Sequence, residues 1–250
     1  MAILATEGLV KNFGGLRATD DLSLAIEEGK LTSVIGPNGA GKTTLFNLIT
    51  GMIRPDAGRI LFHGEDISRL PVYQIVRRGV SRSFQILNLF NEITLRENVW
   101  LGVAAQQGHG AEVLTHADAL GPVAEETDRV IAEAGLTSRA DVPVKLLSYG
   151  DRRLLEITLS LTTKPSLLLL DEPTSGLMSE DRRRISDVLK RLSSRLTLLV
   201  VEHAMDVVLS ISDHIVVMHQ GRLLAQGPPS AIRANAEVQE AYLGGQYAEV

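Results

Sequence analysis

The chain has no cysteine in its 250 residues, which excludes disulfide bonds, thiolate metal sites and cysteine nucleophiles. It also has no long apolar run. The longest runs, residues 167–170 and 198–201, are far shorter than the roughly 18 to 20 residues that a membrane-spanning helix needs. The N-terminal segment lacks a basic stretch followed by an apolar core, so no signal peptide is expected. Any work at a membrane would therefore depend on a partner.

An excess of positive charge is missing as well, because the formal net charge is −5. This argues against a protein that binds nucleic acid through bulk positive charge, and we expect no nucleic-acid partner. The apolar share of 44% and the charged share of 22% are ordinary for a soluble globular protein. The length suffices for one large α/β domain, or for a core with a small insert.

The most informative segment is glycine-rich and follows an apolar run at residues 31–35. It matches G-x-x-x-x-G-K-[ST], the phosphate-binding loop between a strand and a helix. Glycine permits the backbone turns that direct N–H groups around an anion, and the following helix adds its N-terminal dipole. The alternative is a turn that merely caps a helix, which the strand–helix context disfavours. The residues expected to bind a nucleoside triphosphate are Gly36, Pro37, Asn38, Gly39, Ala40, Gly41, Lys42, Thr43 and Thr44.

Strand and helix patterns divide the chain into an α/β core and a helical insert. Beyond residue 162, runs of leucine and valine alternate with helical patterns, which is typical of a buried parallel sheet. Helical patterns dominate from about residue 94 to residue 161. We expect strands at 3–5, 22–26, 31–35, 59–62, 166–170, 197–201 and 214–218, a loop at 106–121, and helices at 43–51, 71–78 (with Pro71 first), 95–105, 123–134, 150–161, 179–192 and 204–211.

Two adjacent carboxylates, Asp171 and Glu172, end the apolar strand of residues 167–170. Open α/β sheets place their sites at this end of their strands. Asp171 suits a ligand of Mg²⁺ opposite Thr43, because this ion prefers hard oxygen ligands. Glu172 could polarise an attacking water molecule. A solvated acidic turn is the alternative, and the phosphate-binding loop upstream disfavours it.

These motifs resemble the nucleotide-binding subunit of ABC (ATP-binding cassette) transporters, and the resemblance covers essentially the whole sequence. It implies a single α/β domain, residues 1–250, with the P-loop NTPase core of the ABC ATPase type. An N-terminal antiparallel β subdomain and a mostly helical insert belong to this fold. The core would comprise about residues 1–93 and 162–250, and the helical subdomain about residues 94–161. ATP and Mg²⁺ are the implied cofactors.

The resemblance also implies roles for single residues. Phe13 lies where the family stacks an aromatic ring on adenine, although it could instead be a core residue. Gln85 matches a glutamine that contacts Mg²⁺ and water. His203 matches the switch histidine that touches the γ-phosphate, where a lone histidine would otherwise have a structural role. The implied catalytic residues are thus Lys42, Gln85, Glu172 and His203, and the implied Mg²⁺ ligands are Thr43, Gln85 and Asp171.

Residues 147–151 resemble the signature motif of the family. Ser148 and Gly150 offer a hydroxyl and bare N–H groups at a helix start, which suits an anion; a simple N-cap is compatible with the same serine. The family closes two cassettes head to tail, so these residues would cover the phosphate held by Lys42 of the other cassette. Tyr149 and Met178 depart from the commoner residues, and an active ATPase is still expected.

Several segments, residues 13–16, 82–90 and 238–244 among them, resemble the subgroup of branched-chain amino-acid importers, which includes relatives for urea and short amides. This implies a second cassette (identical or not), transmembrane permease subunits and, indirectly, a periplasmic or lipoprotein solute-binding protein. The chain would lie on the cytoplasmic face of the inner (plasma) membrane. Apolar residues between Ile86 and Trp100 would form a groove for the permease, or pack the insert on the core.

Two other functions remain open at this point. A soluble ABC ATPase of the iron–sulfur assembly type is not excluded by the length of the chain. An unrelated phosphate-loop kinase or GTPase is disfavoured, because the guanine-specific pattern Asn-Lys-x-Asp is absent and the signature would have no role.

Overall fold

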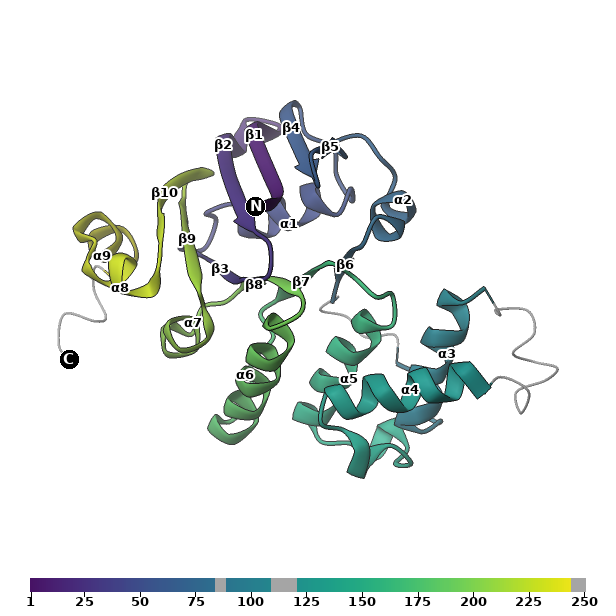
Figure 1. The fold of residues 1–250 in the computed structure, drawn as a ribbon. Helices are drawn as coiled ribbons and strands as arrows, with labels where there is room; N and C mark the ends of the chain where they lie inside the picture. The colour runs from purple at the N-terminus through teal and green to yellow at the C-terminus, as the bar shows by residue number, and fades with distance from the viewer. Residues whose placement is uncertain (84–88, 109–120, 244–250) are drawn as a thin grey trace.

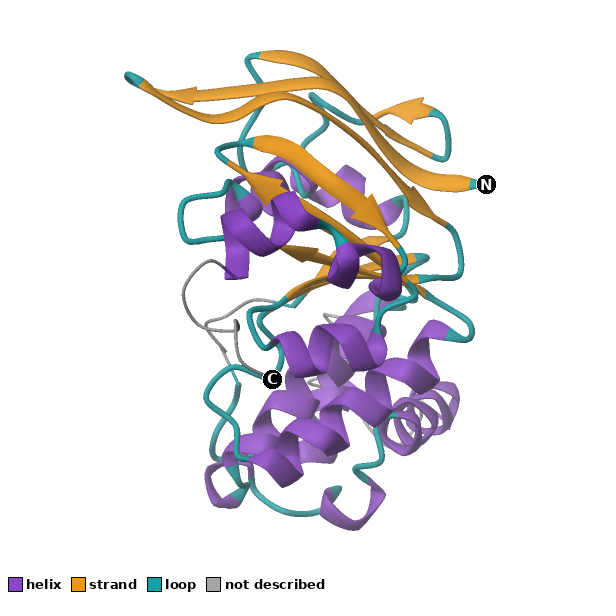
Figure 2. Ribbon diagram, turned by 90° about the vertical axis from the view of Figure 1, so that its left-hand side faces the viewer, coloured by secondary structure: helices purple, strands orange, loops and turns teal. Residues whose placement is uncertain are grey.

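The fold consists of two β-sheets and a separate group of helices (Figures 1 and 2). The structure, a computed structural model, describes residues 1–83, 89–108 and 121–243. The larger sheet has the strand order β10-β9-β3-β8-β7-β6, and all its neighbouring strands are parallel except β9 and β10. Its strands are β3 (Leu31–Ile35), β6 (Val80–Arg82), β7 (Leu167–Asp171), β8 (Thr197–Val201), β9 (His214–His219) and β10 (Arg222–Gly227). The predicted parallel core is confirmed.

The smaller sheet is antiparallel, in the order β2-β1-β4-β5, and lies at the top of Figure 1. Its strands are β1 (Ala2–Phe13), β2 (Leu16–Glu27), β4 (Ala57–Phe62) and β5 (Glu65–Asp66). The strands predicted at 3–5 and 22–26 are present as parts of β1 and β2, but both strands are much longer than expected. Register shifts interrupt their pairing, as between Thr6 and Leu9, and they break the alternation by which long strands are recognised in a sequence.

The first seven helices occupy nearly the expected positions, whereas α8 and α9 were not predicted. They are α1 (Lys42–Ile49), α2 (Val72–Arg77), α3 (Leu95–Gln106), α4 (Gly121–Glu133), α5 (Tyr149–Leu161), α6 (Ser179–Ser193), α7 (Met205–Ile211), α8 (Pro229–Ala234) and α9 (Ala236–Leu243). Pro71 is not the first helical residue but the extended N-cap of α2, with ψ 153°, which corrects the prediction. Thr94 starts α3 with a capping box to Glu97. None of the described helices is long and apolar enough to cross a bilayer.

Each face of the parallel sheet has its own apolar core. Because side chains alternate along a strand, Leu168 and Leu170 of β7 pack with α3 to α7, whereas Leu167 and Leu169 face the other side. There they join Phe46 of α1 and the antiparallel sheet. Helix α1 is thus enclosed between the two sheets, while α3, α4 and α5 lie together at the lower right of Figure 1. Of the expected loop at 106–121, residues 109–120 lie outside the described residues.

Candidate nucleotide site

The glycine-rich loop joins the buried strand β3 to α1, as the sequence predicts. Gly36 (φ 153°) lies against β9: a Cβ there would come within 2.1 Å of the Met218 carbonyl oxygen. Gly41 (φ 98°) lies against β2, where a Cβ would be 2.4 Å from the Ala18 carbonyl oxygen. Gly39 (φ 81°) faces open space. Two of the glycines therefore permit close backbone approach, and the third only permits the turn.

These environments predict unequal effects on stability. Gly39→Ala should lower the free energy of unfolding by about 1 to 2 kcal/mol, the cost of a left-handed alanine. Gly36→Ala should lower it by about 3 kcal/mol or more, because the strand next to it must also move. Thermal or urea unfolding of both variants checks this, and equal losses would contradict the packing described for Gly36.

Lys42 is buried at the start of α1 and folds back on the loop. Its Nζ donates to the carbonyl oxygens of Gly36 (2.7 Å) and Pro37 (3.0 Å). Burial lowers the pKa of Lys42, and the charges of Glu172 and Asp171 oppose this shift. The ammonium group thus lies between the loop and the two carboxylates. Thr43, next along the helix, is exposed.

Asp171 is the last residue of β7 and forms a buried ion pair with Arg82 of β6, with Arg82 Nη2 2.8 Å from Asp171 Oδ2. Arg82 Nη1 donates to Asn47 Oδ1 (2.6 Å), and its guanidinium lies 5.5 Å from the centre of the Phe46 ring. Asn47 and Phe46 thus hold the Arg82 guanidinium, which in turn fixes the Asp171 carboxylate. Sequence reasoning missed this role, because nothing in the sequence marks Arg82 as buried.

A carboxylate and a hydroxyl, Asp171 and Thr43, are donors that suit Mg²⁺. No group of three or more His, Asp or Glu side chains that could hold a metal occurs within residues 1–83, 89–108 and 121–243. The donor set therefore fits an ion that arrives with phosphate oxygens and water, the usual way in which Mg²⁺ is held at nucleotide sites. Gln85, the third expected ligand, lies outside the described residues.

Glu172 and His203 meet at the ends of β7 and β8, where Glu172 Oε1 and His203 Nε2 are 3.0 Å apart. Glu172 has a left-handed backbone, φ 47°, which is uncommon for a residue with a side chain. The buried Glu202 joins the two segments: its Oε1 accepts from Thr174 N (2.8 Å) and Thr174 Oγ1 (2.7 Å), and its Oε2 accepts from His203 N (3.1 Å). Sequence reasoning gave Glu202 no role.

The signature segment begins α5. Ser148 is its N-cap and accepts from Asp151 N at 3.1 Å, so the predicted cap is confirmed. A Cβ on Gly150 would meet the Asp181 carboxylate of α6 at 2.4–2.7 Å, so a larger residue here would have to displace that side chain. Tyr149 and Met178 are 61% and 83% exposed. Among the described residues, no hydrogen bond or ion pair joins this segment to the glycine-rich loop.

Phe13 ends β1 and is 49% exposed, with the Lys11 ammonium 5.7 Å from its ring centre. The alternative of a core residue is therefore wrong. Of the apolar residues near the expected groove, Leu89 and Trp100 pack against the helical core, whereas Phe90 is 61% exposed. The other two apolar residues of that segment, Ile86 and Leu87, lie outside the described residues.

A family model described as "ABC transporter" matches residues 19–175. The chain belongs to the ABC transporter family. A second model, described as "Branched-chain amino acid ATP-binding cassette transporter", matches residues 222–248 of the cassette. The family is that of ATPases that couple hydrolysis to transport, so the cassette is an ATP-binding component that works with permease subunits. The predicted family, fold class and enzyme class are confirmed.

Relatives of the cassette resemble it over nearly their whole length. The high-affinity branched-chain amino acid transport ATP-binding protein BraF of Pseudomonas aeruginosa is 41% identical, over 97% of the cassette and 98% of the relative. The protein of the same description, LivG, from Escherichia coli is 39% identical over the same shares. A crystal structure of the ADP conformation of an ATP-binding cassette of an ABC transporter has a TM-score of 0.86 at 31% identity, over 98% of the cassette and 99% of that chain.

A buried ion pair on α5 of the cassette lies beside the Asp171–Glu172 turn. Arg153 and Glu156 are each less than 10% exposed, and Arg153 Nη1 donates to Glu156 Oε2. Burial raises the pKa of Glu156 from its ordinary 4.5 to about 6, and Arg153 only partly offsets this. Sequence reasoning missed the pair, because an arginine and a glutamate three positions apart on a helix are usually exposed.

The raised pKa predicts how the stability of the cassette depends on pH. The folded chain binds more protons at Glu156 than the unfolded chain does, so the stabilisation is present below pH 4.5 and is lost as pH rises through about 6. Glu156→Gln cannot titrate. The Tm of this variant relative to the wild type should therefore rise between about pH 5 and about pH 7. A difference in Tm that stays constant with pH would contradict the raised pKa.

Proposed function

We propose that the cassette is the ATP-hydrolysing subunit of an importer for branched-chain amino acids. The observation that carries this proposal is the match at residues 222–248 to a model of that transporter group, beside relatives that bear this description. Urea or short amides are the alternative solutes within the same subgroup. The solute itself does not contact this subunit, so the proposal concerns the permeases that the cassette drives.

The same proposal gives each site residue a role. Residues 36–44 enclose the phosphates of ATP, with Lys42 on the β and γ phosphates, and Phe13 stacks on adenine. Thr43, Gln85 and Asp171 would hold Mg²⁺, which would neutralise phosphate charge.

Glu172 accepts a proton from the attacking water. His203 orients that carboxylate and touches the γ-phosphate, and their 3.0 Å contact supports this pairing.

A second cassette completes the site in this proposal. Ser148 and Gly150 of one cassette cover the γ-phosphate held by Lys42 of the other, in a head-to-tail pair of identical or different chains. The exposure of Tyr149 and Met178 beside this segment supports a partner surface there. ATP would favour the closed pair because it binds that state better.

Permease subunits would hold the pair at the cytoplasmic face of the inner membrane. A solute-binding protein outside would deliver the solute to these permeases. Within each cassette, residues 94–161 act as a helical subdomain on a core of residues 1–93 and 162–250. The grouping of α3, α4 and α5 supports this division.

Uptake by cells that lack the gene for the cassette tests the proposal. The wild-type gene should restore uptake of radiolabelled leucine, and the Glu172→Gln variant should not. If the gene restores uptake of urea but not of leucine, urea would take the place of branched-chain amino acids as the proposed solute. If no multi-span membrane protein co-purifies with the cassette, the result would contradict transport and favour a soluble ATPase of the iron–sulfur assembly type.

A further inference from the structure

Arg153 reaches from α5 to three consecutive backbone carbonyl groups at the end of β7. Its Nη2 donates to the carbonyl oxygens of Asp171 (2.9 Å) and Glu172 (2.7 Å), and its Nε donates to that of Pro173 (3.3 Å). With the bond to Glu156, four of the five N–H groups of the guanidinium are used. An ion pair alone would need only one or two of them.

The turn that Arg153 contacts is the one that aims the Glu172 carboxylate. The left-handed backbone at Glu172 costs free energy and persists only where the surroundings fix it. The carbonyl groups of Asp171 and Pro173 stand on either side of this residue, and Asp171 is the last residue of β7, so the chain leaves the sheet at this turn. Arg153 therefore binds the turn where its conformation is least favourable.

We propose that Arg153 is a positioning residue that holds the Glu172 carboxylate from the signature helix. This inference rests on the proposed function, in which Glu172 accepts the proton of water. Ser148 and Arg153 lie five residues apart on one helix, about 7.5 Å along its axis. When the Ser148 end of α5 binds the nucleotide of a partner cassette, the position of the whole helix is fixed. Arg153 on that helix then fixes the Glu172 turn in the cassette's own site. The two ATP sites of a pair are thus linked through one rigid element.

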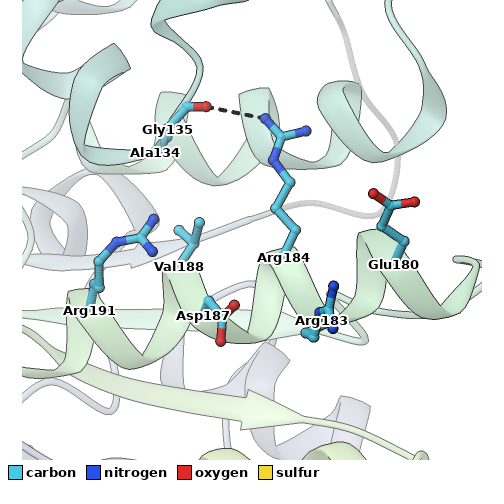
Figure 3. A pocket seen from close by; sticks show the side chains of 8 residues that line it. All are labelled: Ala134, Gly135, Glu180, Arg183, Arg184, Asp187, Val188 and Arg191. Carbon is cyan, nitrogen blue, oxygen red and sulfur yellow. Dashed lines mark hydrogen bonds between the residues drawn. The ribbon is translucent and has the colours of Figure 1, made fainter.

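A second arginine provides a matched control, because it ties α5 to the core without touching the turn. Arg184 of α6 donates to Asp151 Oδ1 (2.6 Å) and to the Gly135 carbonyl oxygen (3.1 Å), beside a pocket of about 280 Å³ (Figure 3). Loss of Arg184 should loosen the docking of α5 and leave the conformation at Glu172 intact.

The test compares steady-state ATP hydrolysis by four purified full-length proteins: wild type, Glu156→Gln, Arg184→Gln, and the double variant Arg153→Gln/Glu156→Gln. The double variant removes the guanidinium without leaving an unpaired buried carboxylate, which would itself destabilise the fold. Its kcat should fall by about 10²-fold, the effect of a displacement of about 1 Å. Its KM for ATP should stay within about twofold, because the phosphate-binding loop is untouched.

Each control isolates one explanation. Glu156→Gln keeps the three carbonyl contacts and Arg184→Gln keeps the turn, so both should retain kcat within about threefold. In an Arg153→Ala/Glu156→Gln protein, added guanidinium chloride at millimolar concentration should restore part of the lost kcat. A guanidinium requirement of this kind is not expected of a residue that only stabilises the fold.

The outcomes separate this inference from the proposed function. A wild-type kcat in the double variant, or an equal loss in Arg184→Gln, would overturn the positioning role even if leucine uptake is confirmed. So would a loss of kcat in the Arg153→Ala/Glu156→Gln protein that guanidinium does not restore. If the Glu172→Gln variant hydrolyses ATP normally, the proposed function of Glu172 fails first, whatever Arg153 does.

Discussion

Replacing Glu172 with glutamine should lower ATP turnover by about 10²- to 10⁴-fold while ATP binding is kept, because the loss of a general base has effects of this size. Glutamine has the shape of glutamate and can keep the contact to His203, so the left-handed turn should stay intact. It cannot accept a proton from water. Purified protein should also shift to an ATP-dependent dimer, since nucleotide that is not hydrolysed would keep the proposed pair closed.

Hydrolysis rate, nucleotide binding and size-exclusion chromatography measure these three effects. Glu180→Gln is the matched control: it removes the charge of an exposed glutamate on α6, eight residues further along, and should change none of them. Normal hydrolysis by the Glu172 variant would show that another group activates the water. A variant that neither hydrolyses nor binds ATP would point instead to a collapsed site.

The second large effect is expected at Lys42. Lys42→Met should weaken ATP binding by about 10- to 100-fold, the loss of about 1.5 to 3 kcal/mol from one charge-assisted hydrogen bond. The effect should fall on affinity as well as on rate, because the proposed contact of Lys42 with the phosphates would exist in the ground state too. The methionine side chain fills the same space beside the loop carbonyls, so the strand–loop–helix unit should stay folded.

Lys30 is the control for this change, since it lies at the opposite end of β3 and pairs with Glu27 on the surface. Lys30→Met removes the same charge from the chain and should leave ATP affinity unaltered. Equal affinities in the wild type and the Lys42 variant, measured by titration with a fluorescent ATP analogue, would contradict the assigned role.

Much of this fold could be predicted from local patterns. The apolar run at residues 31–35 and the glycines after it specify a strand, a turn and a helix without help from distant residues. The same holds for Asp171, which follows an unbroken apolar strand. Their meeting at one edge of the sheet could also be expected, because the carboxyl ends of parallel strands share that edge.

Features that depend on distant contacts could not be predicted. Nothing near Arg153 in the sequence shows that it is buried, since the carbonyl groups that bind it come about 20 residues later. The left-handed conformation of Glu172 is likewise imposed by its surroundings, because glutamate has no preference for it. The length of the β1–β2 hairpin was underestimated for a related reason. Its register shifts depend on how the two strands pair, and neither strand's own sequence shows this.

The pairing of β3 has a consequence for the order in which the domain matures during synthesis. Both neighbours of β3, the strands β8 and β9, come from residue 197 onward, and Gly36 packs on Met218. A chain leaving the ribosome therefore carries the sequence of the glycine-rich loop long before that loop can take its shape. ATP can bind only a nearly finished domain, and it then stabilises that domain against unfolding by mass action.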